Sequence, residues 1–154
     1  MKNILFVIIL SIGFPSFAQN SQVTRTKHFN LEKNLALQGF DPISYFTKGK
    51  AIKGNPKIVA NYAGIDYYFS SEANKNLFVA NPSKYEPQYG GWCAYALGEK
   101  GTKVEIDPET FKIIDGKLYL FYNAFFNNTL TSWNKNEKEL KSKADKNWEK
   151  IIQP

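Results

Sequence analysis

The stretch that decides the fold is residues 57–85, KIVANYAGIDYYFSSEANKNLFVANPSKY. Apolar and polar residues alternate up to an Ala-Gly turn, and β-branched and aromatic residues follow it, which is the pattern of a β-hairpin. Ser70 or Ser71 can cap the next segment as a helix, and an Asn-Pro pair ends that helix before Ser83. The stretch therefore predicts two paired strands that run directly into a helix.

Two further turns of the chain carry local signals. Asp41 followed by Pro42 suits the N-cap and first position of a helix, so we expect a helical turn through Phe46. A carboxylate lining a site is the functional alternative for Asp41. Farther on, the pair Asp115-Gly116 supplies the positive φ values of a type I′ turn and predicts a second hairpin.

The C-terminal segment predicts one more helix. Its apolar residues recur at spacings of four, four and three: Leu140, Ala144, Trp148 and Ile151. Such a stripe is typical of a helix that docks on a sheet. In chain order these elements predict an α+β domain, in which a small antiparallel sheet built from two hairpins carries short helices and a C-terminal helix. Two separate sheets are the alternative that the pattern leaves open.

The first 18 residues have the form of a signal peptide. Lys2 supplies a positive charge, residues 4–14 are an apolar run too short to span a bilayer, and small residues precede a cleavage point after Ala18. We therefore expect an exported protein, periplasmic or secreted, with no membrane anchor after signal cleavage.

The chain beyond the predicted cleavage point divides into three segments. Residues 19–34 are polar and lack periodicity, which predicts a mobile N-terminal arm rather than a packed element. The domain itself is expected at residues 35–125, and residues 126–154 form a helical extension of the same domain. At 154 residues the chain has room for a single domain.

Charge and cysteine content narrow the function classes. The formal net charge is +6, but the lysines are scattered and alternate with acids near the C-terminus, so no basic block suited to nucleic acid is present. One cysteine in an exported chain excludes an intramolecular disulfide and a dithiol redox cycle. Stability must come from an ordinary core, which an aromatic content of 16% makes feasible.

Four motifs occur in order along the chain, namely GFDPISYF, YYFSSEANKNLFVANPSKY, QYGGWCAYA and IIDGKLYLFY. Together they resemble the YHS domain, in particular its exported, stand-alone branch, some members of which carry selenocysteine. The resemblance covers about residues 36–122. It implies a small metal-binding module whose cysteines fall here on Ser44, Ser70 and Asn74. Because soft metals need thiolate or imidazole ligands, we expect these three positions not to bind metal.

QYGGWCAYA holds Cys93, the only cysteine, and the resemblance implies a reactive sulfur or selenium at this position. We expect a pocket around it formed by its neighbours in sequence: Tyr89, Gly90, Gly91, Trp92 and Tyr95. If a helix begins at Trp92, its dipole lowers the pKa of the thiol. The competing interpretation is that Cys93 is a small buried core residue.

Three functions are compatible with these residues and stay open. The first is an exported binding module, handling a metal or a small ligand, with Cys93 as reactive group or ligand to copper or zinc. The second is a one-cysteine thiol oxidoreductase, and the third is a non-catalytic interaction domain with Cys93 buried. A non-enzymatic role is favoured, because the only histidine, His28, lies in the predicted arm and no other catalytic set is present.

Overall fold

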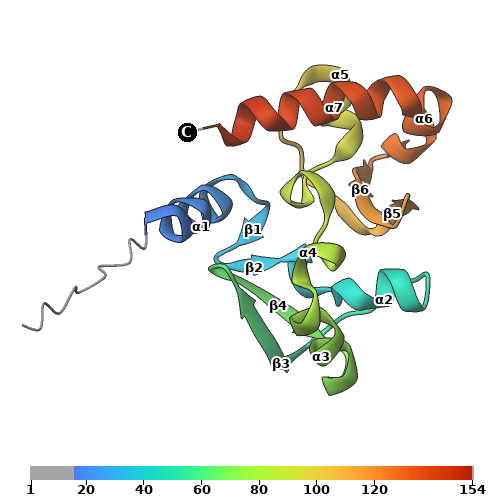
Figure 1. Ribbon diagram of the computed structural model, residues 1–154. Helices are drawn as coiled ribbons and strands as arrows, with labels where there is room; N and C mark the ends of the chain where they lie inside the picture. The colour runs from blue at the N-terminus through green and yellow to red at the C-terminus, as the bar shows by residue number, and fades with distance from the viewer. Residues whose placement is uncertain (1–15, 154) are drawn as a thin grey trace, which may run out of the picture.

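The computed structural model of the protein describes residues 16–153, and its class is α+β, as predicted (Figure 1). The first fifteen residues of the predicted signal peptide lie outside this range. Within it no helix is both long and apolar enough to cross a membrane. The helices are α1 (Ser16–His28), α2 (Pro42–Thr47), α3 (Glu72–Ala80), α4 (Pro82–Tyr85), α5 (Ala94–Lys100), α6 (Thr129–Lys135) and α7 (Glu137–Ile152), with 3-10 turns η1 (Leu37–Gly39) and η2 (Gln88–Gly91).

The strands form three small sheets. They are β1 (Leu31–Glu32), β2 (Leu35–Ala36), β3 (Asn55–Tyr62), β4 (Ile65–Phe69), β5 (Asp107–Ile114), β6 (Lys117–Phe121), β7 (Asn123–Ala124) and β8 (Asn127–Asn128). The largest sheet has the order β1-β2-β4-β3, in which only the β2–β4 pair is parallel. Strands β5 and β6 form the second sheet and β7 and β8 the third.

The local predictions are confirmed. Both hairpins form, and their turns take positive φ values, 47° and 85° at Ala63-Gly64 and 51° and 70° at Asp115-Gly116. Asp41 caps α2 by accepting the amide of Ile43 at 2.9 Å. These features depend on a few consecutive residues and are therefore readable in the sequence.

The expectation that the two hairpins share one sheet is wrong. The edge of β4 that faces away from β3 pairs with β2, through the parallel pair Leu35 and Asp66. Beside β6 lies the irregular segment that follows α4, where Pro87 bridges Leu118 and Cys93 bridges Leu120. The free edge of each hairpin is therefore covered by another segment of the chain, and β4 and β6 do not pair with each other.

Residues 19–34, which we expected to lack a packed element, contain most of α1 and the whole of β1. Arg25 on α1 donates two hydrogen bonds to Glu86, and its guanidinium lies 4.6 Å from the centre of the Phe29 ring. The buried Tyr67 donates to the same carboxylate. The helix is therefore held by a charged contact rather than by an apolar stripe, and this is why periodicity did not reveal it.

The core has two clusters of buried side chains. One lies between the large sheet and α3 and is centred on Tyr67, Phe69 and Phe78. The other lies among α5, α6, α7 and β6, and includes Leu97 and Trp133. Helix α7 thus packs largely against α5, and β3 and β4 of the large sheet lie at the other end of the molecule (Figure 1).

Gly98 allows α5 and α7 to approach closely. A methyl group at this position would lie 2.5 Å from the carbonyl oxygen of Leu140. We expect Gly98→Ala to lower the free energy of unfolding by about 1–3 kcal/mol, because the two backbones must separate. Helix propensity alone would favour alanine by about 1 kcal/mol, so a gain of stability in urea unfolding would show that the contact does not matter.

Candidate functional site

Cys93 lies at the N-terminus of α5 and is held on three sides. Its backbone amide donates to the carbonyl of Val104 at 3.0 Å. Its sulfur accepts a hydrogen bond from the backbone amide of Tyr122 at 3.3 Å and lies 3.4 Å from the hydroxyl oxygen of Thr129. The residue is 0% exposed. The position of the thiol is therefore set by Tyr122, which follows β6, and by Thr129 in α6, both distant from it in sequence.

A cavity of about 250 Å³ lies beside this thiol. Its walls come from α5, from the loop that follows α5, and from the chain between β6 and α6. The lining residues are Cys93, Tyr95, Ala96, Glu99, Lys100, Thr102, Val104, Tyr122, Asn127 and Thr129. Because Cys93 borders the cavity without exposed surface of its own, a bound molecule would reach the sulfur only after a neighbouring side chain moves.

Of the pocket residues expected around Cys93, the structure brings only Tyr95 to this cavity. Tyr89 and Gly90 line a different hollow of about 380 Å³ against α7. Gly91 borders a third, small hollow with Asn30. The difference arises because the chain turns between η2 and α5, so residues adjacent in sequence face opposite sides.

The aromatic residues before the cysteine have structural partners. Tyr89 donates to Asp145 at 2.8 Å, and burial, together with this bond, raises the pKa of Tyr89 well above its usual value. Trp92 donates through its ring nitrogen to the carbonyl of His28 at 2.7 Å. The condition that a helix begins at Trp92 is not met, because α5 begins at Ala94 with Cys93 as its N-cap residue and is only seven residues long.

The first glycine of the pair, Gly90, serves close packing. Gly90 has a φ of 60°, and a methyl group there would lie 2.7 Å from the ring of Phe29 and 2.9 Å from that of Trp148. Its carbonyl accepts the amide of Asn30 at 2.9 Å. Gly90 thus lets Phe29, at the end of α1, and helix α7 pack against η2.

His28 does not complete a metal site with Cys93. Its ring nitrogen Nδ1 lies 3.4 Å from the ammonium of Lys103, and burial together with the charges of Lys103 and Lys27 lowers the pKa of His28. From residue 16 to residue 153 the structure contains no group of three or more His, Cys, Asp or Glu side chains placed to hold a metal ion.

The three positions that the resemblance equates with cysteines do converge in space, around Asp41. The carboxylate oxygen Oδ2 of Asp41 accepts the amide and hydroxyl of Ser70, at 2.8 and 2.6 Å, and the side-chain amide of Asn74, at 2.6 Å. The hydroxyl of Ser44 donates to the Asp41 carbonyl at 2.7 Å. Asp41 and Ser44 are both 0% exposed.

This arrangement does not fit a soft metal. It offers no sulfur and no imidazole, and its one carboxylate already accepts four hydrogen bonds, one of them from the Ile43 amide at the start of α2. A hydrogen-bond network here joins α2, the end of β4 and α3. The sequence indicated that Asp41 caps a helix. It did not indicate that Asn74 also donates to the Asp41 carboxylate, because these two residues meet only in the folded chain.

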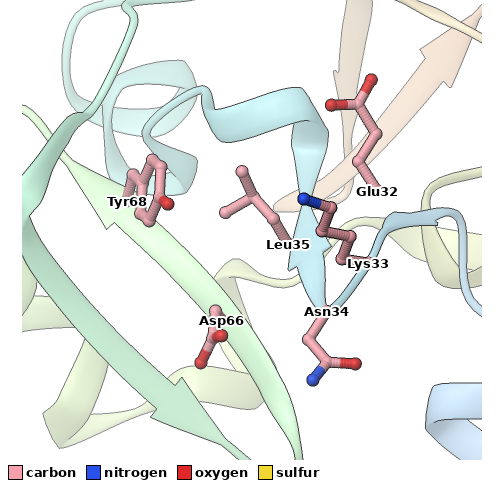
Figure 2. Close-up of a pocket in the computed structure, with 6 residues that line it drawn as sticks. All are labelled: Glu32, Lys33, Asn34, Leu35, Asp66 and Tyr68. Atoms are coloured by element: carbon pink, nitrogen blue, oxygen red, sulfur yellow. The ribbon is translucent and has the colours of Figure 1, made fainter.

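A hollow of about 420 Å³ that no sequence pattern indicated lies between the β1–β2 hairpin and β4. It is lined by Glu32, Lys33, Asn34, Leu35, Asp66 and Tyr68, and Figure 2 shows the hairpin residues on one side and the two β4 residues on the other. The carboxylate of Asp66 is bound to Asn61 at 2.7 Å. The hollow depends on the parallel β2–β4 pair, which has no local signal.

Comparison with protein families identifies one region of the chain. The family model of the YHS domain matches residues 43–89, from α2 into η2. This range includes Ser44, Ser70 and Asn74 but ends before Cys93 and begins after Asp41. No curated protein and no solved structure matches the chain.

Proposed function

We propose, starting from the YHS domain that this chain carries at residues 43–89, that the protein is a small exported binding module whose ligand occupies the cavity beside Cys93. The observation that carries the proposal is the placement of the only cysteine against a cavity built from two separate segments, residues 93–104 and 122–129. The cavity lies outside the matched region, so the ligand site belongs to the later segments of the chain.

The lining suggests the chemistry of the ligand. Tyr95, Ala96 and Val104 offer apolar surface, while Glu99 and Lys100 place one charge of each sign in the wall. At about 250 Å³ the cavity lies just below the usual range for drug-sized ligands, about 300–1,000 Å³. A small molecule with an apolar body and a polar end fits this description.

Handling of copper or zinc is the weaker form of the proposal. One sulfur with a hydroxyl and a backbone amide as neighbours is an incomplete donor set for either ion, so further ligands would have to come with the metal. Titration with Cu(I) and Zn(II) tests it. Equal affinity in the wild type and in Cys93→Ser would remove Cys93 from any metal site.

Thiol redox activity is the second candidate, favoured by the position of the sulfur, which borders the cavity and accepts a hydrogen bond from the backbone amide of Tyr122. Without a second cysteine the reaction would need an external reductant. Alkylation by iodoacetamide in the native protein and in urea distinguishes the candidates, since a reactive thiol labels fast in the native protein, whereas a thiol that stays buried behind the cavity wall labels many times more slowly.

The binding proposal predicts the effect of filling the cavity. Ala96→Leu adds three carbons to the wall, and Ala80→Leu makes the same change on the exposed face of α3. We expect calorimetric titration with indole and benzoate, two small probes of the inferred chemistry, to show binding to the wild type and to Ala80→Leu, and at least about tenfold weaker binding to Ala96→Leu. Equal affinity in all three proteins, or binding in none, would rule out this cavity as the site.

A further inference from the structure

The hairpin of β7 and β8 presents two aromatic side chains to solvent at its tip. Asn123 pairs with Asn128 and Ala124 with Asn127, which leaves Phe125 and Phe126 as a two-residue turn. Phe125 is 91% exposed and Phe126 is 111% exposed. The other large apolar side chains that are exposed between residues 22 and 153 occur singly on helices and strands, which is ordinary for a protein surface.

The backbone of this tip is strained as well. Phe125 and Phe126 have φ values of 50° and 63°, the left-handed region that a two-residue turn of this type requires. Asn-Gly or Asp-Gly is the usual solution, and bulky side chains are unusual there. No other residue in the described part of the chain covers the two rings. Contacts within the chain therefore do not offset the strain or the exposure.

The size and charge of the tip indicate what it contacts. Two phenylalanines offer about 300–500 Å² of surface, well below the roughly 800 Å² that each side of a stable protein interface buries. The tip also lies in a stretch without carboxylates, residues 116–136, which contains two lysines and no acid in a chain that has 14 acidic residues. Apolar side chains that protrude from a chain with a formal net charge of +6 suit the boundary of an anionic bilayer.

We propose that Phe125 and Phe126 insert into the interface of a membrane that carries anionic phospholipids and so dock the protein on it. The contact is peripheral and needs no spanning segment. Because the hairpin also supplies Asn127 to the wall of the cavity beside Cys93, docking would place that cavity near the lipid surface.

The test uses the exported protein with its N-terminus identified by mass spectrometry, so that the apolar residues 4–14 do not contribute. The comparison variant, Phe125→Asn with Phe126→Gly, removes both rings and installs the preferred turn, so its melting temperature should equal or exceed that of the wild type. We expect sedimentation with vesicles of equimolar phosphatidylglycerol and phosphatidylcholine to show at least about tenfold weaker binding of the variant. Binding of the wild type should be weaker to phosphatidylcholine alone and should fall with added salt.

A second measurement reports directly from the tip. Phe126→Trp should show a blue shift of its emission, after subtraction of the wild-type spectrum, with the anionic vesicles. Equal vesicle binding of the wild type and the Asn-Gly variant, or no shift, would overturn the proposal. Equal binding to both kinds of vesicle would overturn its anionic part. Self-association of the wild type that the variant lacks, without vesicle binding, would assign the tip to a second copy of the chain instead.

Discussion

Asp41→Asn is expected to lower the free energy of unfolding by about 2–4 kcal/mol, although the side chain keeps its shape. The carboxylate accepts from Ile43 through one oxygen and from Ser70 and Asn74 through the other. An amide has only one oxygen, so in either orientation its NH₂ group faces buried donors. A donor that loses its acceptor in this way cannot bind water at that point instead, since Asp41 is fully buried.

Asp66→Asn is the matched control for this substitution. Its carboxylate has one side-chain partner, Asn61, in an exposed setting on β4, and we expect a change within about 0.5 kcal/mol. Urea unfolding followed by tyrosine and tryptophan fluorescence measures both variants. If Asp41→Asn proves as stable as the control, the network around Asp41 does not hold α2, β4 and α3 together, and the positions of Ser44, Ser70 and Asn74 would need another explanation.

Arg25→Met is expected to destabilise the protein by about 2–4 kcal/mol and to release α1. The substitution leaves the buried carboxylate of Glu86 with Tyr67 as its remaining side-chain partner. Burial works to lower the pKa of Arg25, but the hydrogen bonds and charge of Glu86 outweigh it and leave that pKa raised, which shows that the pair favours its charged form. Removing one charge of a buried pair costs more than the pair itself contributes.

Hydrogen exchange separates a local effect from a global one. In Arg25→Met the amides of α1 should lose protection first, because Arg25 is the α1 side chain that reaches Glu86. Lys75→Met is the control, since its partner Glu72 is 3.8 Å away on the exposed face of α3, and such pairs contribute about 0–1 kcal/mol. Unchanged protection of α1 in Arg25→Met would mean that the packing of Phe29, rather than the charged contact, holds the helix.

The burial of Tyr67 gives the same site a pH dependence. Burial, reinforced by the charge of Glu86, raises the pKa of Tyr67 well above its ordinary value of about 10. Below that value tyrosine is protonated in both the folded and the unfolded chain. Above it only the unfolded chain loses the proton, so stability falls as the pH rises past about 10 and the contact with Glu86 persists below that pH.

Several features could be predicted because their cause is local. The hairpin turns depend on adjacent residues that tolerate positive φ, and the cap of α2 depends on Asp41 standing two residues before the amide it accepts. The stripe from Leu140 to Ile151 likewise follows from helical spacing, although its docking partner, α5, does not. Each of these rests on a contact within a few residues.

The candidate site was predictable only in part. The sequence singled out Cys93 and Tyr95, which do border one cavity, but it grouped Tyr89 and Gly90 with them, and these face another hollow. Thr129, whose hydroxyl lies against the sulfur, carries no signal of its own. Residues separated by thirty or more positions meet there because strand β6 and the segment before α5 run side by side.

The amino-acid sequence by itself therefore determined the two main hairpins with their turns, the caps of α2 and α3, helix α7, the absence of an internal disulfide and the α+β class. Only the tertiary structure decided which segment lies along the free edge of each hairpin, that a charged contact holds α1, and which cavity Cys93 borders. The physical reason is the range of the interactions. Propensity, capping and turn geometry act between neighbours, whereas sheet edges, buried ion pairs and cavities are settled by which distant segments exclude water from one another most completely.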